Sequence, residues 1–457
     1  MQVFHCKLLA TAVSAILLSA CGDAETNIVE KDPIKVEDDH NHGDGYLIES
    51  AGRLAVLSAD SNTASIYNLD DKTLLGSFAL TYDSSRLSAS AGYRYALITT
   101  RGEDLIEFID GGLWREDHGE HLHDYKQNPS MSTYQLMGSR PTHIVNHDGK
   151  LAVFYDGDAN TGAAASVQVI TDTDITNKTQ SLPELSYAIN MHGVAEPHDD
   201  YLITTVRRDD AESTSGNKIL PDQVAVYHLH DNEYEQEHVF ATACPDLHGA
   251  AQNEHYQVFG CSDGVLVTEK TETGYRSAKI DNIASLDGLR VGSVYSHHEV
   301  VSFVGVASQH GGGTAVLVEI NPDDSEMENI DWQALDNAQP ISYHFSSDGE
   351  HFLILDNLGY LTLLSAHQEG GHSHWEFETR IDISEEDVAS MPDGMSFSMT
   401  LSQNSHLAFV ADPIAQHIVQ VDLESAQITA EIELNFTPAS LTWLGIAETE
   451  HDADHDH

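Results

Sequence analysis

The sequence contains few basic residues. Of its 457 residues, 21 are Lys or Arg and 74 are Asp or Glu, so the formal net charge is −53. Proteins that bind DNA or RNA need a basic surface to neutralise phosphates, and nucleic acid is therefore not expected as a partner. A strongly acidic chain instead favours cations, solubility and a location outside the cytoplasm.

Apart from its N-terminus, the sequence has no extended apolar run. The segment "LLATAVSAILLSA" at 8–20 follows Lys7 and ends in small residues. It is too short to span a bilayer as a helix, and it is typical of a signal peptide over residues 1–20. "LSAC" at 18–21 resembles a lipobox, which implies lipidation of Cys21 as the first mature residue. Gly22 in place of Asp favours the outer over the inner membrane, and a plain secretory signal is the alternative.

Cysteine is scarce, with four residues in the chain. Cys6 leaves with the signal peptide and Cys21 is the lipidation candidate. In an oxidising periplasm the remaining pair, Cys244 and Cys261, is expected to form a disulfide that closes a small loop. A thiol-based metal site is the alternative, and the lack of further cysteines argues against it.

Long helical periodicity is nearly absent as well. Short apolar or alternating segments such as "KLAVFYDGD" and "TAVLVEINPDD" recur between Asp, Asn, Gly and Ser, as in strands joined by tight turns. A strand–turn–strand–hairpin unit returns roughly every 40 to 50 residues, which is the period of propeller blades. The sequence predicts an all-β fold, a β-propeller over residues 45–446 with eight blades, or seven as the alternative. The segments "ITAEIELNF" and "SLTWLGI" are expected to complete a blade with the N-terminal strand.

The two ends of the chain are acidic and polar. Residues 21–44 are predicted to be a disordered tether, and residues 447–457 a tail rich in His and Asp. Both are candidates for scavenging metal ions, with solubilising tails as the alternative reading. Their histidines are His40, His42, His451, His455 and His457.

Histidine is abundant, and its 28 residues outnumber Lys and Arg together. Four repeats place a histidine about eight residues before the next apolar strand, and a fifth repeat has Met399 there. The innermost strands of a propeller line its central channel, so equivalent positions on several blades converge. The sequence therefore predicts a ring of imidazoles at the channel mouth, with structural histidines as the alternative. The four histidines are His143, His192, His248 and His344.

The segment "LWREDHGEHLHDY" at 113–125 holds three further histidines among four carboxylates. On a helix His118 and His121 would share a face, whereas on an extended chain His121 and His123 would share a side. We assign the segment to a long connection between blades, and such loops are usually functional. It is predicted to be a mobile flap, and a solvated charged loop is the alternative.

Imidazole and carboxylate are the ligands that Zn²⁺ takes when thiols are absent, usually in a shell of four. We expect His121 and His123, with His118 nearby, to meet ring histidines or blade groups over the channel. The further blade candidates are Asp246, His406 and Asp412. The high imidazole content argues against Ca²⁺ and Mg²⁺ and the absence of Cys and Met clusters against Cu(I), while Cu(II) and Ni(II) remain open.

The segments "REDHGEHLHDY", "THIV", "MHGVAE" and "CPDLHG" together resemble the AztD-type periplasmic zinc metallochaperones. The resemblance covers most of the mature chain. It implies an eight-bladed propeller that binds zinc where a His-x-His flap meets the propeller face, and that passes zinc to the solute-binding protein of a zinc ABC importer. By this resemblance His121 and His123 are ligands and "CPDLHG" supplies Asp246 or His248. The lipobox departs from the family and implies a tethered chaperone.

The expected function is therefore zinc carriage by a monomer, not catalysis. A metal-dependent propeller hydrolase of the lactonase or phosphoesterase type is the rival, since fold does not determine function. A catalytic zinc keeps one position open for water, whereas a closed shell is expected for cargo. An interaction scaffold with incidental histidines is a third reading.

Overall fold

The computed structural model describes residues 47–83, 86–118, 121–206, 220–272, 274–309, 313–369 and 372–448, with the backbone alone at 368–369 and 372–373. Within these ranges no helix has the length and apolar character needed to cross a membrane. Several predicted residues lie outside the described part of the chain, namely Cys21, His40, His42, His451, His455 and His457.

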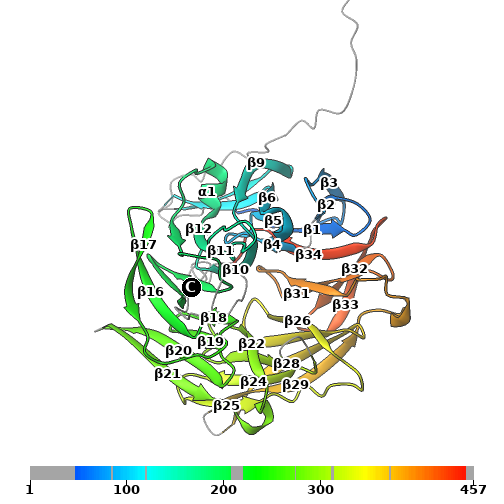
Figure 1. Cartoon of the computed structure of the whole chain (residues 1–457). Coiled ribbons are helices and arrows are strands. Elements are labelled where there is room, and N and C mark those ends of the chain that lie inside the picture. The colour runs from blue at the N-terminus through cyan, green and yellow to red at the C-terminus, as the bar shows by residue number, and fades with distance from the viewer. Residues whose placement is uncertain are drawn as a thin grey trace, which may run out of the picture.

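The strands form eight four-stranded blades around a central axis, as predicted (Figure 1). From the axis outward, the first four blades are: blade 1, β34 (Pro438–Leu444), β1 (Arg53–Ser58), β2 (Thr63–Asn68) and β3 (Leu74–Ala79); blade 2, β4 (Arg86–Ala89), β5 (Tyr95–Thr100), β6 (Leu105–Asp110) and β9 (Ser130–Met137); blade 3, β10 (Pro141–His147), β11 (Lys150–Tyr155), β12 (Ser166–Ile170) and β13 (Glu184–Ser186); blade 4, β14 (Ala195–His198), β15 (Tyr201–Val206), β16 (Gln223–His230) and β17 (Glu233–Val239).

The other four blades follow in chain order: blade 5, β18 (Ala250–Gln252), β19 (Tyr256–Gly260), β20 (Gly264–Thr271) and β21 (Gly274–Asp281); blade 6, β22 (Arg290–Tyr295), β23 (Phe303–Ser308), β24 (Val316–Asn321) and β25 (Glu326–Asn329); blade 7, β26 (Pro340–Phe345), β27 (His351–Asp356), β28 (Tyr360–Glu369) and β29 (His372–Asp382); blade 8, β30 (Ser398–Leu401), β31 (Leu407–Asp412), β32 (His417–Asp422) and β33 (Gln427–Glu433). A single pair, Glu184↔Glu233, joins the outer edges of blades 3 and 4.

The two ends of the described chain share blade 1, because β34 pairs antiparallel with β1. Trp443 on β34 is 1% exposed. Its Nε1 donates to the Ala51 carbonyl at 3.0 Å, and its ring packs edge-on against Tyr93 with centroids 5.7 Å apart. The expectation for "SLTWLGI" is confirmed, whereas "ITAEIELNF" is wrong because it forms β33, the outer strand of blade 8.

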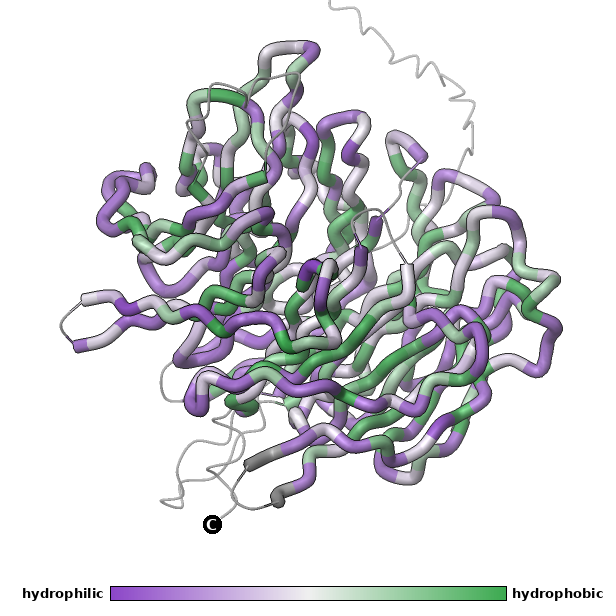
Figure 2. The backbone as a smooth tube through the Cα atoms, turned by 60° about the horizontal axis from the view of Figure 1, so that its bottom comes forward, coloured by the Kyte–Doolittle hydropathy of each residue, from purple (hydrophilic) through white to green (hydrophobic). Residues whose placement is uncertain are grey.

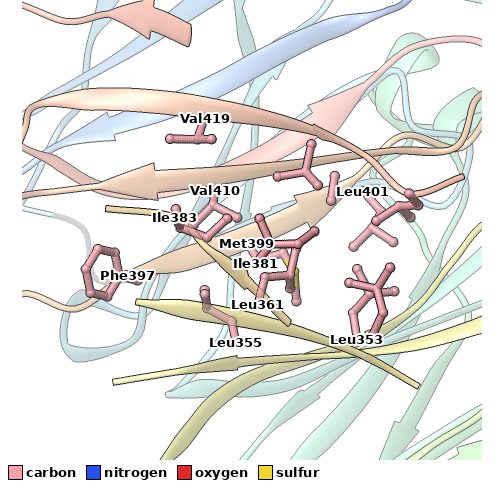
Figure 3. Close-up of a cluster of buried hydrophobic side chains, with 14 residues drawn as sticks. Leu353, Leu355, Leu361, Ile381, Ile383, Phe397, Met399, Leu401, Val410 and Val419 are labelled. Atoms are coloured by element: carbon pink, nitrogen blue, oxygen red, sulfur yellow. The ribbon is translucent and has the colours of Figure 1, made fainter. Parts of the chain in front are cut away.

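Hydrophobic side chains fill the spaces between neighbouring blades. Between blades 7 and 8, for example, Leu353 and Leu355 of β27 belong to the same buried cluster as Val410 and Val419 of blade 8 (Figure 3). A middle strand such as β27 is buried on both faces and reads as an apolar run. Polar residues dominate the outer strands and loops (Figure 2).

Among the described residues the helical elements are few and short, namely α1 (Asp172–Asn177), η1 (Arg101–Glu103), η2 (Ala284–Leu286) and η3 (Val388–Ser390). The N-terminus of α1 is closed by a capping box between Thr171 and Asp174. The predicted disulfide is present, with Cys244 Sγ and Cys261 Sγ 2.09 Å apart and both residues fully buried. It holds the segment before β18 against the end of β19.

A two-stranded hairpin extends from blade 2 between β6 and β9. Its strands are β7 (Leu113–Asp117) and β8 (Leu122–Lys126), and we call residues 113–126 the histidine hairpin. At its base Arg115 Nε donates to the buried Asp124 at 2.7 Å. Trp114 stacks on Tyr125 at 4.9 Å and lies under the Arg94 guanidinium. The base is therefore fixed to the blade.

We expect Trp443→Ala to destabilise the ring strongly, because it removes a large fully buried side chain from the closing blade. Losses for such truncations are about 3–5 kcal/mol in the free energy of unfolding. Urea unfolding followed by fluorescence and circular dichroism measures the change. Tyr82→Ala is the control, since Tyr82 is 41% exposed. Equal effects of the two substitutions would contradict the role given to the closing strand.

Candidate metal centre

The innermost strands of all blades run in the same direction, so the propeller has two distinct faces. Arg86 at the start of β4 donates to the carbonyl of Thr142, near the start of β10, at 2.8 Å. We call the face at these N-terminal ends the start face. The opposite face, which carries the turns from first to second strands, is the hairpin face.

Three histidines from three successive blades meet on the start face. His143 lies on β10, and His192 and His248 precede β14 and β18. One ring nitrogen of each lies within 4.8 Å of the others. His143 Nε2 and His192 Nε2 are 3.2 Å apart, close to the roughly 3.3 Å that separates two nitrogens on a tetrahedral Zn²⁺ with bonds of about 2.05 Å. Three of the four histidines predicted at the channel mouth therefore lie close together, and we call them the three-histidine cluster.

Acceptors behind the cluster orient two of the rings. His192 Nδ1 donates to Asp156 Oδ2 at 3.1 Å, and the same oxygen accepts from Arg101 Nη2 at 2.8 Å. His248 Nδ1 donates to the Gly292 carbonyl at 2.9 Å. A histidine that binds metal usually donates its other N–H in this way, which fixes the tautomer. Both rings therefore direct Nε2 toward the cluster.

The sequence did not reveal these acceptors. Asp156 follows β11 in "FYDGD", where an Asp-Gly pair indicates a turn, and it is fully buried. The Gly292 carbonyl belongs to the backbone of the next blade and has no sequence signature.

The cluster favours a cation over a proton at its centre. Burial and, to a smaller extent, the neighbouring His192 and His248 together lower the pKa of His143 to about 3, against an opposing effect of Asp156. His143 is thus neutral at physiological pH, with a nitrogen lone pair available to a metal. The disulfide fixes the loop that carries His248, whose N–H donates to the Gly260 carbonyl at 3.2 Å.

The fourth predicted ring histidine, His344, does not join the cluster. Pro141↔Tyr155 and Pro340↔Asp356 are equivalent pairs in blades 3 and 7, so Ser342 holds the position of His143. His344 lies two residues further along β26 and bonds to the backbone of Met399. Met399 itself belongs to the hydrophobic cluster between blades 7 and 8 (Figure 3).

The other blade candidates also lie elsewhere. Asp246 is exposed in a turn with a φ of +52°, so "CPDLHG" contributes His248 to the cluster and not Asp246. His406 lies on the hairpin face, where its Nδ1 is 2.6 Å from Asp348 Oδ2. Asp412 is buried in blade 8 beside His417.

The histidine hairpin lies at the other end of the inner strands. Asp110, which precedes it, pairs with Tyr95 beside the turn from β4 to β5, so the hairpin leaves from the hairpin face. A seven-residue inner strand such as β10 is roughly 20 Å long, so the hairpin base is well separated from the three-histidine cluster. The prediction that this segment closes over the channel-mouth histidines is corrected accordingly.

Within the hairpin the three imidazoles gather at the tip. The ring centroids of His121 and His123 are 4.7 Å apart, and His118 lies 5.0 Å from His123 and 5.9 Å from His121. His118 Nε2 is 3.7 Å from Glu116 Oε2. These three imidazoles and the three-histidine cluster thus lie on opposite faces of the propeller.

Comparisons with known proteins agree with the propeller fold. The chain is 20% identical over 419 residues to the zinc chaperone AztD of Citrobacter koseri, covering 89% of this chain and 90% of that protein. Two solved structures of AztD from Citrobacter koseri, one of the apo form, match with a TM-score of 0.69 and 18% identity over 87% of this chain and 98% or 99% of theirs. The fold is shared with AztD. No family model matches the sequence.

A more distant structural match extends the comparison. The dihydro-heme d1 dehydrogenase NirN has a TM-score of 0.52 and 10% identity, with 91% of this chain and 79% of NirN covered. That likeness concerns the propeller architecture alone.

Asp156→Asn is expected to weaken zinc binding at the three-histidine cluster by about 10–100-fold, because the carboxylate that orients His192 is lost. Competition with a chromophoric chelator measures the affinity. Asp158→Asn is the control, since Asp158 faces Arg140 at 3.8 Å rather than the cluster. Equal affinities in the two variants would remove Asp156 from the site.

His344 should make folding sensitive to acid. Burial lowers its folded pKa from 6.5 to about 4, so the unfolded chain binds the proton more tightly. The contribution of neutral His344 is complete above pH 6.5 and is lost as pH falls from 6.5 toward 4. Urea midpoints across this range should fall less steeply for His344→Gln than for the wild type. Parallel slopes would show that His344 does not titrate in this way.

Proposed function

We propose that the protein binds Zn²⁺ at His143, His192 and His248 and delivers it to another protein as a chaperone. The observation that carries this proposal is the convergence of three ring nitrogens within 4.8 Å, two of them oriented by acceptors behind them. Similarity to a zinc chaperone over most of the chain supports zinc as the cargo.

Three protein ligands leave one position of a tetrahedral Zn²⁺ open. The sequence instead predicts a closed shell for a zinc ion carried as cargo. An open position suits transfer, because a ligand of the recipient can bind before the histidines release the ion one by one. Catalytic zinc sites are also open, but they need a base. Asp156, which contacts the cluster, already accepts from His192 and Arg101, and this favours carriage over hydrolysis.

The histidine hairpin serves in this proposal as a second zinc-binding element on the opposite face. His118, His121 and His123 are gathered on a fixed base, where they are accessible to zinc and to a partner protein. The recipient is the solute-binding protein of a zinc ABC importer. A lipid anchor at Cys21 would hold the monomeric chaperone in the periplasm at the outer membrane.

Two double variants separate the two histidine groups. His143→Ala/His192→Ala should abolish tight zinc binding and therefore transfer, because two of three ligands are lost. His121→Ala/His123→Ala should keep the tight site and lose the zinc held by the hairpin. Chelator competition measures binding, and transfer is followed by mixing the zinc-loaded chaperone with the apo solute-binding protein.

Wild-type affinity in the His143→Ala/His192→Ala variant would overturn the assignment of the site. Zinc-dependent turnover of lactones or phosphoesters by the wild type, lost in the same variant, would replace carriage with hydrolysis.

A further inference from the structure

A second group of potential ligands lies in blade 8, also on the start face but across the ring from blade 4. It consists of His417, Glu431 and Glu433, which each place one ligand atom within 4.8 Å of the others. His417 is the first residue of β32 and directly follows the turn from β31. Ala411, near the end of β31, pairs with Ser398 at the start of the inner strand β30, so this turn lies at the N-terminal end of the inner strand. This pairing locates the group on the start face, at the outer part of the blade.

Strand register places the carboxylates around one imidazole. His417 is directly opposite Asp412 on β31 and directly opposite Glu433 on β33. Glu431 is two residues from Glu433 and therefore points to the same side of the sheet. His417 Nδ1 is 3.9 Å from Glu431 Oε2, and His417 Nε2 is 3.7 Å from Asp412 Oδ2.

Asp412 supplies an independent indication of a ligand. It is fully buried, and its Oδ1 accepts from the N–H groups of Ile414 and Ala415 at 2.7 and 3.1 Å. Its Oδ2 and the Nε2 of His417 are buried and have no hydrogen-bond partner among the described residues. A buried carboxylate facing the inner nitrogen of an imidazole is the arrangement that orients a metal-binding histidine, as Asp156 does for His192.

We propose that His417 Nδ1, Glu431 and Glu433 bind a further divalent cation, with Asp412 positioning His417 from behind. One imidazole and two carboxylates suit Zn²⁺, and closure of the 3.9 Å gap by about half an ångström would reach the nitrogen–oxygen spacing of a tetrahedral zinc shell. Both glutamates are exposed, so the ion exchanges readily with solvent. The site is independent of the three-histidine cluster and goes beyond the proposed function.

A comparable group at His297, His298 and Glu299 is less suited to a metal. His297 Nε2 donates to the Ser347 carbonyl at 3.1 Å, and its Nδ1 accepts from the Glu299 N–H at 3.3 Å. Both ring nitrogens of that histidine are therefore occupied, in contrast to those of His417.

The experiment compares zinc titrations of the full chain against a chromophoric chelator. Glu431→Gln/Glu433→Gln should bind one equivalent fewer than the wild type, and Asp412→Asn should weaken that equivalent by about 10–100-fold. Glu385→Gln/Glu386→Gln is the matched control, because it removes two exposed charges from the loop after β29 and should keep the wild-type stoichiometry. Thermal unfolding checks that all variants are folded.

The same titration in the His143→Ala/His192→Ala background distinguishes zinc binding at the blade 8 group from zinc binding at the three-histidine cluster. The blade 8 equivalent should persist there, and a zinc-edge anomalous peak between His417 and Glu431 in crystals soaked with Zn²⁺ would locate it. An unchanged stoichiometry in Glu431→Gln/Glu433→Gln, or a loss equal to that of the control, would overturn the proposal.

Discussion

The antiparallel pairing of β34 with β1 is the constraint on which the architecture depends. It closes eight blades into a ring, so that the first strand of each blade meets the first strands of its neighbours around the axis. Because these inner strands run in one direction, residues at their N-terminal ends converge on one face. His143, His192 and His248 are neighbours only because the ring brings three blades together in this orientation.

Burial and charge then determine what the converged imidazoles can bind. The pKa of His143 falls because burial and two adjacent rings oppose protonation. The buried Asp156 is shared between Arg101 and His192, which fixes one ring without placing a free carboxylate at the cluster. The formal net charge of the chain is −53, so the negative electrostatic potential of the protein attracts cations toward the neutral imidazole ligands.

Much of the fold could be predicted from the sequence, because blade repeats, strand alternation and the isolated cysteine pair are local or periodic signals. Three of the four ring histidines were found in the same way. His344 was not distinguishable, because a shift of two residues along a strand keeps the side chain on the same face. Only the pairing of β26 with β27 shows that Ser342 holds the equivalent position.

The location of the histidine hairpin was missed for a topological reason. A connection between blades lies on the start face, and the sequence predicts such a connection at residues 113–125. The structure inserts them between the third and fourth strands of blade 2, and that turn lies on the hairpin face. Counting strands within a blade decides the face, and the sequence does not mark which strand is the third.

The origin of the three ligands in separate blades has a mechanical consequence. An ion held by His143, His192 and His248 would link three blades, in addition to the side-chain packing and hydrogen bonds that already join them. Ligands that bind only the folded state raise its stability by mass action. The zinc-bound protein would therefore resist proteolysis better than the zinc-free protein, and zinc occupancy would also affect the lifetime of each molecule.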